Sequence, residues 1–227
     1  MLEIFEKFKR VSFIISKQLI FILKNKLNKT EDVNVLNLIN NGYTHIQKNF
    51  PEDIISEVSN KYSLKVNKES ISDNIKLDEI EKKYIFSILK KLNIPKICEK
   101  YLGDNLFWED AYFKYLGNKK SFESAWQPHH DCQLNRLKIY IWISKKNLKT
   151  HPLYYAKGTH TKIKSFLEYK DSRFPKINLK FEEIYGDTGD IIIFDTHGIH
   201  SNFKINQVER ECFIFTVNPG SIFSKNR

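Results

Sequence analysis

The sequence has few cysteines, and they follow no pattern typical of a metal site or a disulfide framework. The three cysteines of the 227-residue chain are Cys98, Cys132 and Cys212, an odd number without any C-x-x-C spacing. Structural zinc sites and disulfide-rich secreted domains both depend on paired cysteines. We therefore expect a reducing, cytoplasmic location and interpret the cysteines as small apolar residues of the interior.

The sequence also lacks an apolar run long enough to cross a membrane. Its most apolar stretch, VSFIISKQLIFIL, is interrupted by Lys17, whereas a membrane-spanning helix needs about twenty apolar residues. The chain begins MLEIFEKFKR, with Glu3 and Glu6 before the first basic residues. A secretory signal has a basic start and an uninterrupted apolar centre. We expect neither a signal nor a spanning helix.

Low-complexity runs and internal repeats are absent as well, and the composition is that of a folded protein. Hydrophobic residues make up 41% of the chain, aromatic residues 14% and charged residues 28%. A chain of 27.0 kDa is long enough for one domain with a sizeable core. We predict a single domain over residues 31–227, preceded by a basic amphipathic helix in residues 1–30.

The first thirty residues carry seven bases and two acids, which is half of the net charge of +10. Apolar residues recur there every three or four positions, which predicts a helix with one apolar stripe. This stripe consists of Ile4, Phe8, Val11, Ile15, Leu19 and Ile22. Two interpretations fit: a peripheral contact with an anionic membrane surface, or packing on the domain with a solvated basic rim. No nucleic-acid recognition motif is present, so we expect no specific nucleic-acid partner.

The secondary structure is predicted to change along the chain from helical to β. Helices are expected over 31–41, 51–63 and 78–101, the last of them broken near Pro95. From Leu106 onward, short runs rich in Ile, Phe, Tyr and Trp alternate with turn-forming residues, as in antiparallel sandwiches and barrels. We predict an α+β fold in which a helical layer precedes a β-barrel.

One predicted strand, LKIYIWIS (137–144), has two chemically different faces. Because side chains alternate along a strand, Leu137, Ile139, Ile141 and Ile143 share one face. The other face carries Lys138, Tyr140, Trp142 and Ser144. The pattern leaves open which face is the interior.

A His-x-Asp motif is the first part of a candidate metal site. Six of the seven histidines lie between His129 and His200. In a strand, residues i and i+2 point to the same side, so His129 and Asp131 would project together while His130 points away. With one more imidazole, such a pair can cap one face of Fe(II) and leave three positions open for chemistry.

The segment GDIIIFDTHGIHSN (189–202) is the second part of that site. It is typical of a turn, a buried strand and polar residues at the strand end, which include His197 and His200. The next strand opens with Arg210. The guanidinium of Arg210 either clamps a dicarboxylate cosubstrate through paired hydrogen bonds or is a solvated cation at the start of a strand.

Four ordered motifs resemble those of the phytanoyl-CoA dioxygenase family of Fe(II)- and 2-oxoglutarate-dependent oxygenases. They are WQPHHD (126–131), PLYYAKGTH (152–160), GDIIIFDTHGIH (189–200) and Arg210. The front of the chain is also similar, in NGYTHIQKNFP (41–51) and KYLGDN (100–105), so the resemblance covers about residues 35–217. This sequence departs from the family pattern at Gln127 and Pro128, at His151 and at Thr159. None of these departures removes a ligand.

The resemblance implies a double-stranded β-helix, the jelly-roll or cupin-like core, and a dioxygenase that uses Fe(II), 2-oxoglutarate and O2, usually to hydroxylate its substrate. It implies that His129, Asp131 and His200 are the catalytic metal ligands, because the spacing from Gly189 matches His200 rather than His197. Arg210 would hold the far carboxylate of 2-oxoglutarate. Further candidates for the cosubstrate pocket are Trp142, Ser201 and Asn202. Lys114 is expected to face solvent instead.

The substrate class and two competing functions complete the sequence-based expectations. We expect a small-molecule substrate or conjugate, and an anionic one in view of the basic residues of a loop predicted to cover the site. These are Lys162, Lys164, Lys170, Arg173 and Lys176. A second hypothesis is a cupin-like metal-binding protein that is not an oxygenase, such as an isomerase or a binding module; Arg210 has no task in it. A third is a peripheral membrane-binding protein, which is compatible with the first.

Overall fold

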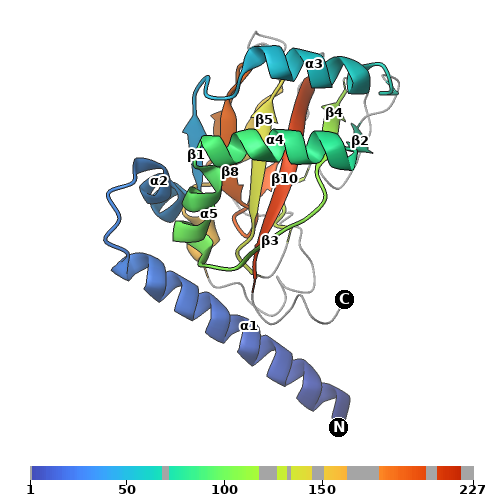
Figure 1. Cartoon of the computed structure of the whole chain (residues 1–227). Helices are drawn as coiled ribbons and strands as arrows, with labels where there is room; N and C mark the ends of the chain where they lie inside the picture. The colour runs from blue at the N-terminus through green and yellow to red at the C-terminus, as the bar shows by residue number, and fades with distance from the viewer. Residues whose placement is uncertain are drawn as a thin grey trace.

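The computed structural model places a helical layer on one face of a large antiparallel sheet and a small sheet on the other face. It describes residues 2–67, 72–117, 127–131, 134–144, 151–162, 179–202 and 209–220. The helices are α1 (Leu2–Leu27), α2 (Val33–Asn41), α3 (Glu52–Ser63), α4 (Glu79–Lys91), α5 (Ile94–Leu102) and the 3-10 turn η2 (Thr159–Thr161). Helices α3 and α4 lie across the large sheet, and the amino-terminal end of α1 projects beyond the other elements (Figure 1).

The large sheet has the strand order β1-β8-β5-β10-β4-β2, with β3 paired to β10. Its strands are β1 (Tyr43–Ile46), β2 (Ser72–Lys76), β3 (Leu106–Trp108), β4 (Tyr112–Leu116), β5 (Leu137–Trp142), β8 (Ile191–Asp195) and β10 (Arg210–Pro219). The small sheet has the order β7-β6-β9, formed by β7 (Glu182–Ile184), β6 (Leu153–Tyr155) and β9 (His200–Ser201). All these pairs are antiparallel. The predicted α+β fold with packed antiparallel sheets is confirmed.

Local sequence signals explain where the helices of the layer begin and end. The carboxylate of Asp32 accepts a hydrogen bond from the backbone N–H of Asn34 and so caps α2. That helix ends at Gly42, whose φ of 86° suits glycine, and a Cβ there would clash with Oη of Tyr155. The break predicted near Pro95 is confirmed, because the proline lies in the first turn of α5, where no N–H is required.

Both faces of β5 are buried, so the sheet has two separate cores. Leu137, Ile139 and Ile141 belong to the core beneath the helices. Tyr140 and Trp142 belong to a second core between the sheets, together with side chains of β6 and β8. The sequence pattern left open which face of this strand is the interior, and in the structure both faces are interior. The polar residues of the inter-sheet face, among them the partly buried Lys138, have to find partners there.

Helix α1 forms as predicted, but the face that it buries differs from the predicted stripe. Ile14, Gln18 and Asn25 are buried, whereas Leu19 is 43% exposed. The buried face lies roughly a quarter turn from the predicted one, at 3.6 residues per turn. The helix is apolar around most of its circumference, so periodicity alone cannot select the packed side. In the part of the chain that the structure describes, no helix is long and apolar enough to cross a membrane.

The structure departs from the sequence-based expectations at one strand, and it tests the expectations for a loop and for the cysteines only in part. Strand β2 was not predicted, because its sequence, SDNIK, contains Asp and Asn, which are rare in strands. The loop predicted to cover the site lies largely outside the described residues, since 163–178 are not among them. The same holds for Trp126 and Cys132. Cys98 and Cys212 are buried and free, in agreement with their interpretation as interior residues.

Candidate metal centre

The backbone brings the two histidine motifs together. The N–H of His129 donates to the carbonyl of His200, and the N–H of His200 donates back, both at 2.9 Å. The N–H of Asp131 donates to the carbonyl of Thr196 at 2.9 Å. The expected strand over WQPHHD is wrong in the described part, 127–131, where only an isolated bridge between His129 and His200 forms. This bridge is nevertheless enough to align the motifs side by side.

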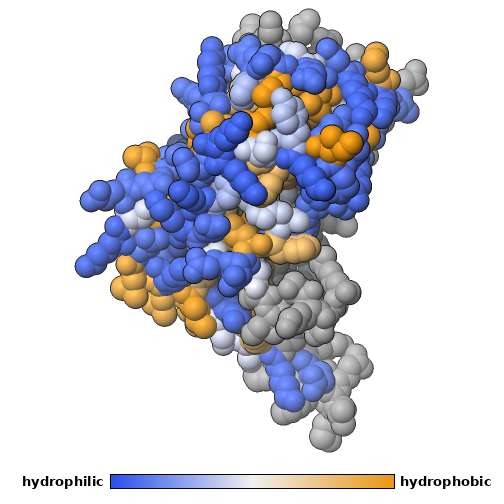
Figure 2. All heavy atoms as spheres, viewed as in Figure 1, coloured by the Kyte–Doolittle hydropathy of each residue, from blue (hydrophilic) through white to orange (hydrophobic). Residues whose placement is uncertain are grey.

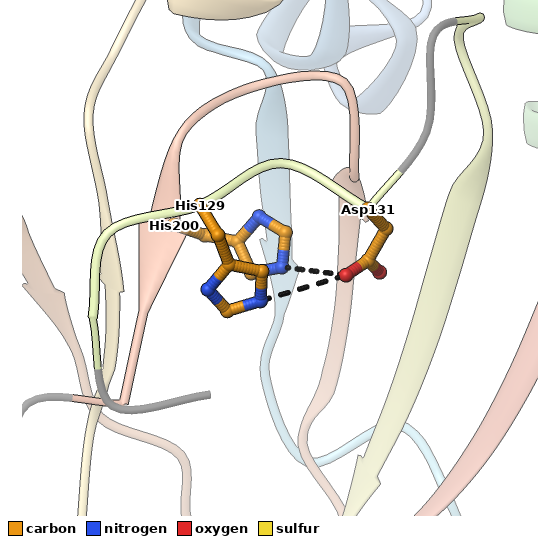
Figure 3. Close-up of side chains that lie close together, drawn as sticks. All are labelled: His129, Asp131 and His200. Atoms are coloured by element: carbon orange, nitrogen blue, oxygen red, sulfur yellow. Dashed lines mark ion pairs between the residues drawn. The ribbon is translucent and has the colours of Figure 1, made fainter. Parts of the chain in front are cut away.

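The side chains of His129, Asp131 and His200 converge at this bridge (Figure 3). Nε2 of His129 is 3.5 Å and Nε2 of His200 is 3.6 Å from Oδ1 of Asp131. One donor atom from each residue lies within 4.8 Å of the other two. An ion held about 2.1 Å from each donor requires donor pairs roughly 3 to 3.6 Å apart. The arrangement fits a metal ion on one face and leaves the opposite side without protein ligands from these three residues.

Each histidine is held with its Nε2 lone pair toward the centre. Nδ1 of His129 lies 2.7 Å from the carbonyl oxygen of Gln127, and Nδ1 of His200 lies 3.0 Å from that of Gly198. A carbonyl can only accept a hydrogen bond, so both Nδ1 atoms carry the proton. Burial lowers the pKa of His200, which favours its neutral form despite the nearby carboxylate. Neutral imidazoles of this tautomer are suitable metal ligands.

Asp131 divides its two oxygens between the histidines and two cations. Nζ of Lys138 is 2.6 Å and Nη2 of Arg136 is 3.2 Å from Oδ2, while Oδ1 faces the histidines. Burial by itself would raise the pKa of Asp131, but the positive charge of Lys138 beside it brings the pKa well below its usual range. Loss of hydration would lower the pKa of the partly buried Lys138, but its pairing with Asp131 raises that pKa above its usual value. The carboxylate is therefore ionised, and Oδ1 is available for a metal.

His130 and His197, which were not predicted to be metal ligands, pack against each other. His130 is 2% exposed, and its ring centroid is 5.8 Å from that of His197. Nε2 of His197 lies 3.2 Å from Nε2 of Gln18 on α1. These contacts explain why α1 buries a glutamine, and they connect the amino-terminal helix to the neighbourhood of the triad.

A second cluster surrounds Arg210, which is fully buried between the sheets. Its guanidinium carbon lies 5.4 Å from the ring centroid of Tyr140 and 5.3 Å from that of Trp142. Nη2 donates to Oδ1 of Asn202 at 2.7 Å. Nε and Nη1 of Arg210, and Nε1 of Trp142, have no hydrogen-bond partner among the described residues. A buried guanidinium with unsatisfied donors is costly without an anion, so this cluster fits a carboxylate ligand.

Lys114 faces the same inter-sheet space, so its predicted orientation toward solvent is wrong. It is the cross-strand partner of Cys212, which is also the partner of Trp142. Directly paired residues point to the same face of an antiparallel sheet. Burial, and then the charges of Lys138 and Arg210, lower the pKa of Lys114 to about 8. Three cations therefore share one interior space, which favours an anionic occupant.

The other predicted pocket residues lie on β9 or directly after it. Asn202 orients the guanidinium of Arg210, as its hydrogen bond indicates. Ser201 is buried and pairs with Tyr154 of β6. Lys138 and Tyr140 were missed in the sequence, although they alternate with Trp142 on one strand. That alternation is the signal that could have identified them.

A buried aspartate fixes the turn that leads to His200. Asp195 is fully buried; its Oδ2 accepts hydrogen bonds from Oη of Tyr101 at 2.7 Å and from Nδ2 of Asn135 at 2.5 Å. Its Oδ1 accepts from the N–H of His197 at 2.8 Å. Because Tyr101 belongs to α5, this network ties the turn to the helical layer. We interpret Asp195 as a residue that positions the loop of the site.

No protein-family model and no curated protein sequence matches the chain, but several solved structures do. The non-heme alpha-ketoglutarate-dependent epimerase SnoN from nogalamycin biosynthesis is 14% identical over 85% of this chain and 87% of its own, with a TM-score of 0.61. The carbocyclase SnoK from the same biosynthesis is 11% identical over 83% and 84%, with a TM-score of 0.60.

HygX from Streptomyces hygroscopicus, solved with nickel and 2-oxoglutarate bound, is 12% identical over 84% of this chain and 87% of its own, with a TM-score of 0.58. Likeness at these identities establishes the fold. The predicted double-stranded β-helix, or jelly-roll and cupin-like core, with its helical layer is confirmed. The chain therefore shares the fold of these three proteins over more than four fifths of its length.

Proposed function

We propose that the protein is an Fe(II)- and 2-oxoglutarate-dependent oxygenase that acts on a small molecule. The observation that carries the proposal is the pairing of two features on one fold: an ionised His-Asp-His triad, and a buried arginine with unsatisfied donors. The structural relatives support it, because SnoN has been solved with Fe3+, alpha ketoglutarate and nogalamycin RO, and HygX with nickel, 2-oxoglutarate and hygromycin B.

In this proposal His129, Asp131 and His200 hold the metal. Iron, when bound, supplies the activation of O2 that is coupled to oxidative decarboxylation of 2-oxoglutarate. The chain provides two Nε2 donors, each oriented by a hydrogen bond at Nδ1, and one ionised carboxylate oxygen in fixed positions. Lys138 and Arg136 hold the second oxygen of Asp131, so that this carboxylate is oriented before any metal binds.

Arg210 is proposed to bind the far carboxylate of 2-oxoglutarate. Asn202 orients its guanidinium, and Tyr140 and Trp142 flank it and exclude water. In a site without water, each charge-assisted hydrogen bond is stronger than at the surface. Lys114 adds a second positive charge to the same space, and Ser201 is a further candidate for this pocket.

Membership of the phytanoyl-CoA dioxygenase family and hydroxylation as the outcome are part of the proposal. The four ordered motifs support the family, and the fold is compatible with it. SnoN is an epimerase and SnoK a carbocyclase, so product analysis has to distinguish hydroxylation from other oxidative outcomes. The alternative is a cupin-like protein that is not an oxygenase. It does not explain why Nε and Nη1 of Arg210 lack a hydrogen-bond partner among the described residues. We also propose a cytoplasmic location, which rests on the free cysteines.

The decisive test is metal-dependent binding of 2-oxoglutarate to the full chain. Calorimetry with Co(II) as an unreactive substitute should show binding of 2-oxoglutarate only when the metal is present. With Fe(II) and O2, succinate should form and increase with candidate substrates, including anionic conjugates. Absence of metal-dependent 2-oxoglutarate binding would contradict the proposal, whichever substrate is tried.

A pH dependence of this binding is expected from Lys114. Its pKa of about 8 means that it is charged below pH 8 and loses its proton above it. A bound dianion favours the charged form and raises that pKa, so the dissociation constant should be constant below about pH 8. Above that value it should rise by up to about tenfold per pH unit, until the pKa of the complex is reached. The variant Lys114→Met should bind more weakly and lose the rise. A rise of the same size in this variant would exclude Lys114 as its cause.

A further inference from the structure

Helix α1 carries a second apolar face that is exposed in the part of the chain that the structure describes. Of the ten large apolar side chains that are exposed among the described residues, five lie on this helix. They are Phe13 (39% exposed), Leu19 (43%), Ile20 (60%), Leu23 (57%) and Leu27 (78%). At 3.6 residues per turn they fall within an arc of about 120°. We refer to these five residues as the outer face.

The outer face is turned away from the domain, because the opposite side of α1 is anchored to it. Gln18 contacts His197, and the ring of Phe21 lies edge-on to Tyr101 at 5.1 Å between centroids. These anchors centre nearly opposite the outer face at 100° per residue. Figure 2 shows apolar side chains at the lower left edge of the molecule, along the carboxyl-terminal half of α1, beside hydrophilic ones. The exposure of the outer face is thus set by how the helix packs.

Basic residues flank the outer face on both sides. On the helix, Lys17 and Lys24 lie along one edge of it and Lys26 along the other. Residues 7–30 contain seven bases and no acid. An apolar face bordered by lysines is the pattern of helices that lie in a membrane interface, with the apolar side among the lipid chains and the bases near anionic headgroups.

We propose that the outer face of α1 binds the surface of an anionic lipid bilayer, with the helix in the plane of the membrane. Charge decides between this occupant and a second copy of the chain. Pairing two outer faces about a two-fold axis would bring the flanking lysines of both copies together, and like charges disfavour such an interface. Anionic lipid instead complements them. The inference does not depend on the proposed oxygenase activity.

The test is cosedimentation of the full chain with vesicles of phosphatidylcholine, with or without phosphatidylserine. The wild type should bind the vesicles that contain phosphatidylserine, and salt should weaken the binding. Ile20→Ser/Leu23→Ser should bind about a hundredfold more weakly, because two large side chains no longer enter the lipid. Lys17→Gln/Lys24→Gln/Lys26→Gln should also lose about a hundredfold at low salt. The matched control Leu64→Ser/Ile80→Ser alters two exposed apolar residues, one directly after α3 and one on α4, and should bind like the wild type.

Three results would overturn the proposal. The first is that the wild type does not bind anionic vesicles. The second is that the wild type and both α1 variants bind them equally. The third is that the chain forms a concentration-dependent dimer that Ile20→Ser/Leu23→Ser abolishes. Circular dichroism spectra and melting temperatures of the α1 variants, compared with those of the wild type, control for their folding. The lysine variant alters only flanking positions and so keeps the test valid if the apolar variant is unstable. Failure of vesicle binding would leave the oxygenase proposal unaffected.

Discussion

Replacing Asp131 by alanine is expected to abolish 2-oxoglutarate turnover. Asp131 is the only anionic member of the triad, and its Oδ1 faces both histidines. Loss of partners that merely orient metal ligands already costs about 10- to 100-fold in affinity or activity. Removal of the carboxylate itself should therefore reduce succinate formation by about a thousandfold or more. Calorimetry with Co(II) should show a parallel loss of metal binding.

The main control for this variant concerns Lys138. Without Asp131, the ammonium group of Lys138 loses the carboxylate that now lies 2.6 Å from it. An uncompensated charge in the interior destabilises the folded state, so the melting temperature should fall. The double variant Asp131→Ala/Lys138→Met should recover stability without recovering metal binding, which separates ligand loss from misfolding. If Asp131→Ala retains turnover, the proposed ligand set is wrong.

The second large effect is expected for Arg210→Ala, which should raise the 2-oxoglutarate requirement steeply. Truncating one partner of a buried, hydrogen-bonded charge pair costs about 2 to 5 kcal/mol, or roughly thirtyfold to a few thousandfold in the dissociation constant. The measurement is calorimetric titration of 2-oxoglutarate in the presence of Co(II). Arg210→Lys should recover part of the affinity, since lysine supplies the charge but not the paired hydrogen bonds.

The control for the Arg210→Ala variant is its affinity for Co(II). The guanidinium contacts Asn202, Tyr140 and Trp142, and none of these belongs to the triad. Arg210→Ala should therefore bind Co(II) like the wild type while binding 2-oxoglutarate poorly. An unchanged affinity for 2-oxoglutarate would instead favour a cupin-like protein in which Arg210 has another role. This pair of measurements distinguishes the two functional hypotheses most directly.

The sequence predicted which segments form helices and strands better than it predicted which side chains meet when those segments pack. Alternation in β5 and the capping signals of α2 depend on neighbouring residues, so they can be read locally. The packed face of α1 depends on where His197 lies, 179 positions from Gln18. Lys114 was placed in solvent because lysine is usually exposed. Its position opposite Cys212 follows from strand pairing, which the residue type does not reveal.

The candidate site was predictable to the extent that it follows strand geometry and motif spacing. Alternation separated His129 from His130, and the structure brings His129, Asp131 and His200 together. The contact between Lys138 and Asp131 was not predictable, because it joins a strand residue to an irregular segment seven positions earlier. The same holds for the cluster around Asp195, which joins residues of three separate segments.

Strand β5 contributes residues to both the proposed metal site and the proposed 2-oxoglutarate site. Its Lys138 contacts the carboxylate of the triad, and its Trp142 contacts the arginine of the second cluster. The two residues are four positions apart on the strand, which corresponds to about 13 Å of extended chain. Because this strand lies between β8 and β10 and is packed on both faces, that spacing is fixed by the close-packed interior. Surface loops can therefore diverge toward new substrates during evolution without disturbing the distance between the two proposed binding sites, for the metal and for the far carboxylate of 2-oxoglutarate.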